Sequence, residues 1–237
     1  MRFTLKQFFV PNFSKKIAIL SVSIFCMGLF VSLLLEAGWG SDPFTFMNES
    51  ISQRLGISFG TWELILNASL IILTIIFAPE LIGFGTLENM IFIGYIADFF
   101  RWVWKTTGIH DVIGFAANPP VWLHVLVFGL SIFLFIISAA VYMNARMGLS
   151  PYDSIPKIIN KGCKKIPFTP LRMCYDASAC IIGFIVSPYT IKDSQLYLPM
   201  IGAVIMVFFL GPVIGLVGRF MQNHIFKDDI ETYSGEN

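Results

Sequence analysis

The sequence predicts an all-α membrane protein of about six transmembrane helices, built as two three-helix repeats that are inverted relative to each other. Three observations predict this fold: few charged residues, six apolar segments, and a set of motifs that recurs along the chain. Of the 237 residues, 56% are hydrophobic and 13% are charged, whereas ordinary soluble domains have about 25% charged residues. This composition leaves too little polar surface for a water-soluble globule, so we expect the lipid bilayer to surround most of the chain.

Six segments are apolar enough to cross a bilayer, whose hydrocarbon core needs roughly 20 apolar residues per helix. Three are nearly free of charge: 17–35, 121–143 and 196–217. Three are shorter and carry charged residues: 60–78, 87–104 and 171–187. We therefore divide the chain into an N-terminal segment (1–16), a first repeat (17–104), a loop (105–120), a second repeat (121–220) and a tail (221–237).

The distribution of Lys and Arg predicts the orientation, because cytoplasmic loops are enriched in basic residues. With a cytoplasmic N-terminus and six spans, eleven basic residues lie inside: Arg2, Lys6, Lys15, Lys16, Arg146, Lys157, Lys161, Lys164, Lys165, Arg219 and Lys227. Four lie outside or at the outer ends of spans: Arg54, Arg101, Lys105 and Lys192. We expect a multi-pass protein of the plasma membrane with both termini in the cytoplasm.

Short motifs recur about 108 residues apart, from Gly40 to Gly148. The segment Gly40-Ser41-Asp42-Pro43-Phe44-Thr45 matches Gly148-Leu149-Ser150-Pro151-Tyr152-Asp153. Further along, Asn67-Ala68-Ser69 matches Asp176-Ala177-Ser178, and the spacing of Gly85 and Gly94 matches that of Gly202 and Gly211. Each half then holds three spans, and an odd number inverts the second half in the membrane, as in many secondary transporters.

The two Gly-x-x-Pro-aromatic motifs, together with Gly85-Thr86-Leu87 and Gly94, resemble those of the YczE/YyaS/YitT group of bacterial membrane proteins. The resemblance covers roughly residues 17 to 220. The first motif departs from the pattern, because Thr45 stands where an acidic residue is expected. No established biochemical activity comes with the group, so the resemblance implies a bacterial plasma-membrane protein and no particular chemistry.

Asp42-Pro43 and Ser150-Pro151 are strong helix-start signals, with an N-cap acceptor followed by Pro at the first helical position. Each opens a short amphipathic segment that is too short and polar to span the membrane. Two arrangements remain open. The segments are either interfacial helices that connect spans, or re-entrant half-helices whose positive N-terminal ends turn inward and attract an anion.

Charged side chains within the spans are the candidate functional residues, because buried ionisable groups in membranes mark functional sites. Glu63 and Asn67 lie four residues apart on one helical face, as do Arg172 and Asp176. Arg172 and Asp176 can simply neutralise each other, and Asp98 and Arg101 are expected to pair. If the charged groups are not sealed in such separate pairs, we expect them to gather around a polar cavity between the halves. The residues predicted to line this cavity are Gly40, Asp42, Pro43, Glu63, Asn67, Gly148, Ser150, Pro151, Asp153, Arg172 and Asp176.

The sequence contains no phosphate-binding, serine-hydrolase or zinc-protease motif, so we expect neither an enzyme nor a cofactor or metal. A formal net charge of +1 gives no reason to expect nucleic acid. Two functions remain. One is a small secondary transporter for a small solute, with an anion among the candidates. The other is a non-transporting membrane partner, such as the substrate-binding subunit of a larger importer or a regulatory membrane protein. A protein partner or a homo-oligomer is compatible with both.

Overall fold

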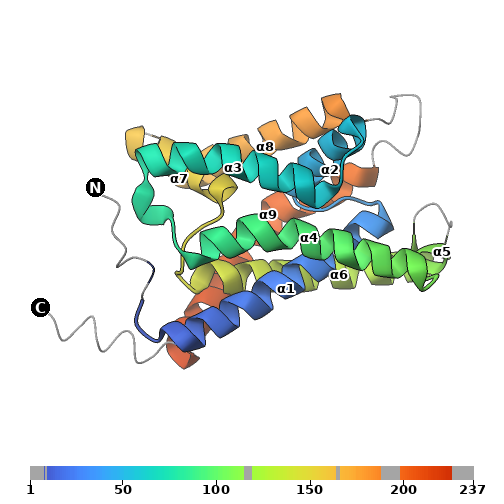
Figure 1. Ribbon diagram of the computed structural model, residues 1–237, viewed down its shortest axis with the longest axis horizontal. Coiled ribbons are helices and arrows are strands. Elements are labelled where there is room, and N and C mark those ends of the chain that lie inside the picture. Colours follow the sequence, from blue (N-terminus) through green and yellow to red (C-terminus); the bar gives the residue numbers. More distant parts are fainter. Residues whose placement is uncertain (1–7, 9, 115–118, 164–165, 188–197, 226–237) are drawn as a thin grey trace, which may run out of the picture.

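The computed structural model describes residues 8, 10–114, 119–163, 166–187 and 198–225, and the regular elements within these ranges are all helical (Figure 1). In chain order they are α1 (Phe13–Ala37), α2 (Pro43–Leu55), α3 (Phe59–Phe77), the 3-10 helix η2 (Pro79–Leu81), α4 (Phe84–Thr106), α5 (His110–Ile113), α6 (Val121–Asn144), α7 (Pro151–Gly162), α8 (Phe168–Val186) and α9 (Leu198–His224). The all-helical prediction is therefore confirmed for this part of the chain.

Four of the helices, α1, α3, α6 and α8, are long and apolar enough to cross a membrane. Helices α4 and α9 have 23 and 27 residues and coincide with the other two predicted spans. Charged residues interrupt α4, among them Glu88, Asp98 and Arg101. Six spans therefore stay a prediction. The expected start of the last span at 196 lies outside the described residues, as do 1–7, 226–237, Lys164, Lys165 and Lys192.

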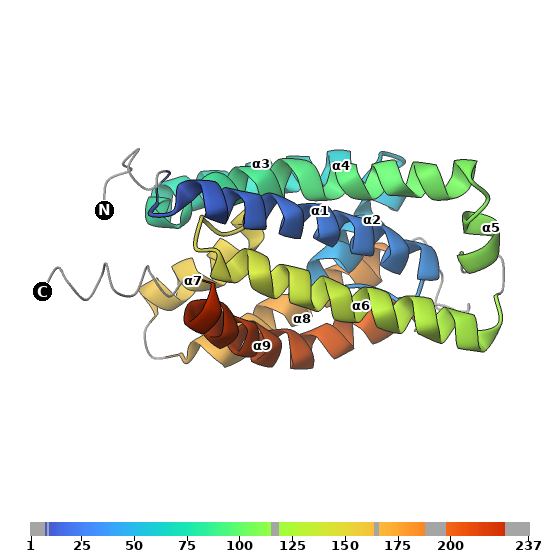
Figure 2. The ribbon, with the colours of Figure 1, turned by 90° about the horizontal axis from the view of Figure 1, so that it is seen from below.

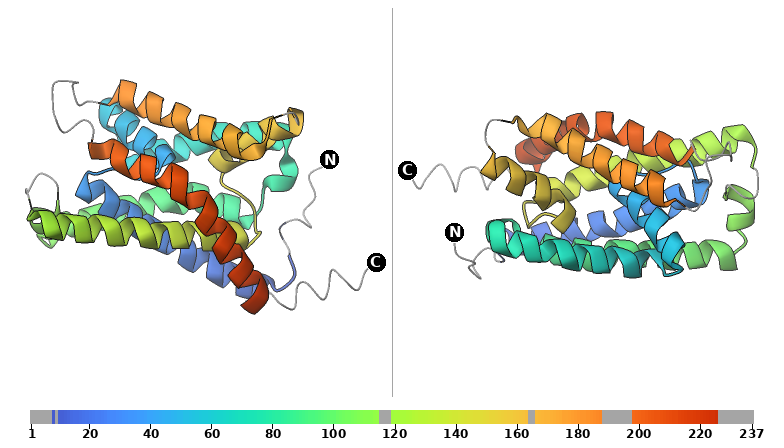
Figure 3. Two further views of the ribbon diagram at one scale, coloured as in Figure 1. Left: turned by 180° about the vertical axis from the view of Figure 1, so that it is seen from behind. Right: turned by 90° about the horizontal axis from the view of Figure 1, so that it is seen from above.

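The long helices run back and forth between the two ends of the bundle, with α9 tilted across the back (Figures 1 and 3). The start of α1 and the end of α9 lie at the same end, where Lys15 Nζ donates to the carbonyl of Ile225 at 2.6 Å. Helix α1 packs against α4 and α6, and α6 packs against α1 and α9 (Figure 2). Their shared apolar core includes Leu20, Val31 and Phe135.

The short helices pack crosswise between the predicted halves. Helix α2 lies against α8, and α7 lies against α3. The loops that precede them also cross over. Trp39 O accepts from Gly202 N at 2.9 Å, and Met147 O accepts from Gly85 N at 2.7 Å. Each loop is thus held by the backbone of a glycine near the start of a long helix, α9 in one case and α4 in the other.

Backbone contact between glycines brings α3 and α4 together. A Cβ on Gly60 would lie 2.6 Å from the carbonyl carbon of Gly94, a distance that real Cβ atoms do not show. Small residues that allow such close approach are characteristic of helix packing in membranes. Gly129 in α6 offers the opposite case, because a Cβ there would meet nothing within 4 Å.

We expect Gly60→Ala to lower the midpoint of thermal unfolding in detergent, because overpacking of this kind costs about 1–3 kcal/mol and both flanking groups are backbone. The matched control is Gly129→Ala, which should leave the midpoint unchanged or raise it, since Ala favours a helix over Gly by about 1 kcal/mol. Equal midpoints for the two variants would contradict the close packing of α3 on α4.

Candidate functional site

Helices α2 and α7 begin inside the bundle and run outward toward opposite ends. Their first turns meet, since the rings of Phe44 and Tyr152 lie 4.3 Å apart. Met27 and Phe135, from the middle parts of α1 and α6, line the same cavity as these two first turns. The loops 38–42 and 146–150 therefore turn back into the molecule (Figure 1). The starts of both short helices therefore lie in the interior of the bundle rather than at its two ends.

The predicted N-caps of both short helices are present. Asp42 Oδ2 accepts from the backbone N–H groups of Phe44 and Thr45, each at 3.1 Å, and the Thr45 hydroxyl donates to Asp42 Oδ1 at 2.5 Å. In α7 the Ser150 hydroxyl accepts from Asp153 N at 3.0 Å and donates to Asp153 Oδ2 at 2.7 Å. The carboxylate and the hydroxyl have exchanged positions between the two motifs.

Arg172 on α8 is held by carboxylates from two helices. Its Nη1 lies 2.6 Å from Asp153 Oδ1, and its Nε lies 2.8 Å from Asp176 Oδ2. The Tyr152 hydroxyl donates to the other oxygen of Asp176 at 2.9 Å, and the guanidinium carbon lies 5.3 Å from the centre of the Tyr152 ring. The predicted pair of Arg172 and Asp176 is therefore present, but as part of a larger cluster that includes Asp153.

Among the described residues, Glu63 and Asn67 on α3 are buried and carry side-chain atoms without hydrogen-bonding partners. Glu63 is 4% exposed and Asn67 is 0% exposed. Glu63 Oε2 and both amide atoms of Asn67 have no partner within the described part of the chain. Gly94 makes room for the carboxylate, because a Cβ there would collide with Glu63 Oε2. Buried groups of this kind carry a desolvation cost of about 1–3 kcal/mol each, so they call for an explanation.

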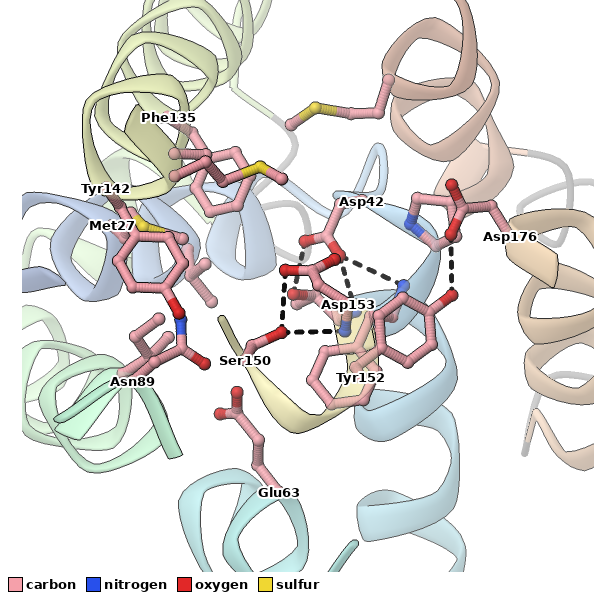
Figure 4. Close-up of a pocket in the computed structure, with 18 of the residues that line it drawn as sticks. Met27, Asp42, Glu63, Asn89, Phe135, Tyr142, Ser150, Tyr152, Asp153 and Asp176 are labelled. Atoms are coloured by element: carbon pink, nitrogen blue, oxygen red, sulfur yellow. Dashed lines mark hydrogen bonds between the residues drawn. The ribbon is translucent and has the colours of Figure 1, made fainter. Parts of the chain in front are cut away.

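These groups surround a cavity of about 80 Å³ near the middle of the bundle (Figure 4). Seven of the predicted site residues line it: Asp42, Pro43, Glu63, Ser150, Asp153, Arg172 and Asp176. Figure 4 shows the Glu63 carboxylate pointing from α3 toward Ser150, with no dashed line to it. Since one water needs about 10–15 Å³ of such space, the cavity holds a few waters or a small solute.

The other four predicted residues, Gly40, Asn67, Gly148 and Pro151, are not among the residues that line the cavity. Asn67 lies one helical turn beyond Glu63, and Pro151 is the first residue of α7. Gly40 packs against Gly202, and Gly148 packs against Gly83. Gly148 has a φ of 106°, a conformation that favours glycine.

Sequence reasoning missed several lining residues. Tyr152 was the aromatic member of a motif, so its position was a usable signal. Asn89 also lines the cavity, and as a polar residue beside Glu88 within a predicted span it too carried a usable signal. Met27 and Phe135 line it as well, but they lie within apolar runs that carried no such signal. The expected pair of Asp98 and Arg101 is wrong. Asp98 Oδ2 accepts from Gly60 N at 2.8 Å, whereas Arg101 contacts Glu36 and Glu49.

The cavity is acidic. Four carboxylates and one guanidinium line it, and the guanidinium is already shared by Asp153 and Asp176. No group of three or more His, Cys, Asp and Glu side chains within the described ranges is arranged to hold a metal ion. The lining offers hydrogen-bond acceptors and aromatic faces.

We expect Arg172→Gln to lower the midpoint of thermal unfolding, because the part-buried Arg172 donates to two carboxylates and a hydrogen bond between charged groups contributes about 1.5–3 kcal/mol. Arg172→Lys should recover only part of the loss, since an ammonium lacks the fork that contacts two carboxylates. The double variant Arg172→Gln with Asp176→Asn should also recover part of the lost thermal stability. If the double variant is no more stable than Arg172→Gln alone, the cluster does not hold the site together.

The chain was compared with known proteins. Residues 14–219 match the model of a family described as a family of unknown function (DUF6198). The uncharacterized membrane protein YczE of Bacillus subtilis (strain 168) is 27% identical over 132 residues, which cover 55% of this chain and 56% of YczE. The uncharacterized protein YyaS of the same organism is 25% identical over 150 residues, 61% of this chain and 68% of YyaS.

An uncharacterized protein of Haemophilus influenzae is 25% identical over 197 residues, 82% of this chain and 83% of that protein. No solved structure shows a significant match. The resemblance to YczE and YyaS expected from the two motifs is confirmed. With its apolar helices the chain is a membrane protein, and it belongs to the DUF6198 family of unknown function.

Proposed function

We propose that the protein is a small secondary transporter of the plasma membrane, in which the central cavity binds a small solute. The observation that carries this proposal is the cavity, lined by four carboxylates and Arg172, between the first turns of two short helices that run toward opposite ends of the bundle. Transporters with inverted repeats bind their substrates at such broken helices near the bilayer midplane. Buried carboxylates without a matching cation are costly in a membrane unless they serve a solute or a coupling ion.

The proposed transporter has six spans in two inverted repeats, and the packing of the helices supports this. The contact of α1 with α4 corresponds to that of α6 with α9, and the contact of α2 with α8 corresponds to that of α7 with α3. The bond from Gly202 N to Trp39 O corresponds to that from Gly85 N to Met147 O. Matched contacts of this kind are expected from a pseudo-two-fold axis that passes between Phe44 and Tyr152.

The proposed solute is small and is not an anion. An anion would need free N–H groups at the helix starts. Here Asp42 and Ser150 already accept from the N–H groups of Phe44, Thr45 and Asp153. The carboxylates around the cavity would also repel negative charge. The anionic solute considered from the sequence alone is therefore not the one we propose.

An open cavity of about 420 Å³ at one end of the bundle supports a route to the central site. It is lined by Phe59, Asp98 and Arg101, among others. Phe59 is the first residue of α3, and Glu63 lies one turn further along the same helix at the central cavity. This end carries Arg54, which we place outside the cell on the basis of the distribution of basic residues.

Reconstitution into liposomes tests the transport proposal. We expect vesicles that contain the protein to accumulate at least one member of a pool of small neutral and cationic solutes, above the level in protein-free vesicles, as measured by mass spectrometry of the lumen. Glu63→Gln should reduce this uptake, and Glu88→Gln, which changes a carboxylate outside the cavity, should not. A folded protein that accumulates nothing, and that copurifies with an ATPase or a second permease, would favour the alternative of a non-transporting subunit.

Cysteine labelling in intact cells tests the orientation. In a background in which the four native cysteines are replaced, we expect Arg54→Cys to react with a membrane-impermeant thiol reagent and Lys161→Cys to react only after permeabilisation. Both side chains are exposed in the structure, so access to solvent on their own side is not limiting. Rapid labelling of Lys161→Cys in intact cells would reject a cytoplasmic location for the loop that follows α7.

A further inference from the structure

The two half-helices and the long helices that follow them carry polar side chains at corresponding positions. The first set consists of Asp42, Thr45, Glu63 and Asn67. The second set consists of Ser150, Asp153, Arg172 and Asp176, in the same order. Only the second set contains a cation. The two sets therefore differ in charge: the second set supplies its own cation, and the first set does not.

The second set contains its own cation, which is paired with both of its carboxylates. Arg172 contacts both carboxylates of the set, Asp153 at 2.6 Å and Asp176 at 2.8 Å. Tyr152 completes the cluster with a hydroxyl that donates to Asp176 and a ring that faces the guanidinium. Planar guanidinium groups suit such two-carboxylate sites, and an aromatic face adds a favourable cation–π contact.

The first set has the carboxylates but no cation. None of the ion pairs among the described residues includes Asp42 or Glu63. Glu63, 4% exposed, lines the cavity (Figure 4), and its Oε2, which lies beside Gly94, has no partner among the described residues. Within the same ranges, Asn67 has two unpartnered amide atoms at the position where the second set has Asp176. A ring is also present, because Phe44 corresponds to Tyr152 and lines the cavity.

We propose that the first set binds a small cation with N–H donors, of the ammonium or guanidinium class, in the role that Arg172 has in the second set. The inference rests on the proposed function, since it names the class of solute that the central cavity takes. The Glu63 carboxylate is the counter-charge, Asp42 adds negative potential, and Phe44 offers its face to the cation. Arg172 balances one of the two carboxylates of the second set, whereas the two carboxylates of the first set have no cation among the described residues, so the larger uncompensated charge lies in the first set.

The lining favours an N–H donor over a metal ion. Metal ions in proteins prefer several carboxylate or imidazole ligands that converge on one point. No such group exists within the described ranges. Carboxylate oxygens and an aromatic face match the directional donors and the spread charge of an ammonium or guanidinium ion. The cavity of about 80 Å³ limits the solute to a few heavy atoms.

Ligand-induced thermal stabilisation of the purified wild-type protein tests the proposal. We expect millimolar guanidinium chloride or methylammonium chloride to raise the unfolding midpoint, relative to sodium chloride and potassium chloride at equal ionic strength. Glu63→Gln should weaken the apparent affinity about tenfold or more, the loss expected when one charge-assisted hydrogen bond is removed. Glu88→Gln is the matched control, because Glu88 accepts only from the exposed Ser21 and does not line the cavity.

A graft of the second set onto the first gives a sharper test. The double variant Glu63→Arg with Asn67→Asp places the Arg172 and Asp176 pair at the corresponding positions of α3. We expect this variant to fold and to lose its response to both organic cations, because its own side chain now supplies the charge. Undiminished stabilisation of the graft by guanidinium would overturn the proposal.

Calorimetric titration of the wild-type protein requires no variant. Saturable heat with guanidinium or methylammonium supports the proposal, and saturable heat with sodium alone, or with none of these salts, overturns it. The outcome is separate from that of the uptake experiment. Uptake of a neutral solute without cation binding would reject the cation site and support the transporter proposal. Cation binding without uptake would support the cation site and reject the transporter proposal.

Discussion

The fold depends on one constraint: a chain that stops being helical inside a bilayer must find hydrogen-bonding partners in the protein, because lipid supplies none. The two crossed loops meet this constraint with backbone groups. Trp39 and Met147 are bonded to Gly202 and Gly85, glycines near the starts of α9 and α4. Because these bonds tie each loop to a long helix distant in sequence, α2 and α7 can begin inside the bundle. The cavity lies between the first turns of α2 and α7.

The sequence was informative where a local rule decides the outcome. The N-caps at Asp42 and Ser150 and the positions of the long helices could be predicted, because capping chemistry and apolar length are properties of short segments. The alternative between interfacial and re-entrant helices could not be decided in the same way. It depends on where Phe44 and Tyr152 meet, and that contact joins residues more than a hundred positions apart.

The same distinction between local and long-range contacts explains which features of the site could be predicted from the sequence. Arg172 and Asp176 are four residues apart, so their pairing was predictable. The contribution of Asp153 from another helix was not, nor was the role of Asp98, which accepts from Gly60 instead of pairing with Arg101. Met27 and Phe135 gave no signal, because in an apolar run the residues that face a cavity look like those that face lipid.

The contact between Gly60 and Gly94 also bears on how the interior can be reached from the bilayer itself. With no side chain between them, the two backbones touch directly beside Glu63. An acyl chain has no space to slip between α3 and α4 at this level. The seam therefore acts as a lateral seal, and a lipid-soluble molecule that diffuses in the plane of the membrane finds no doorway to the Glu63 carboxylate through it.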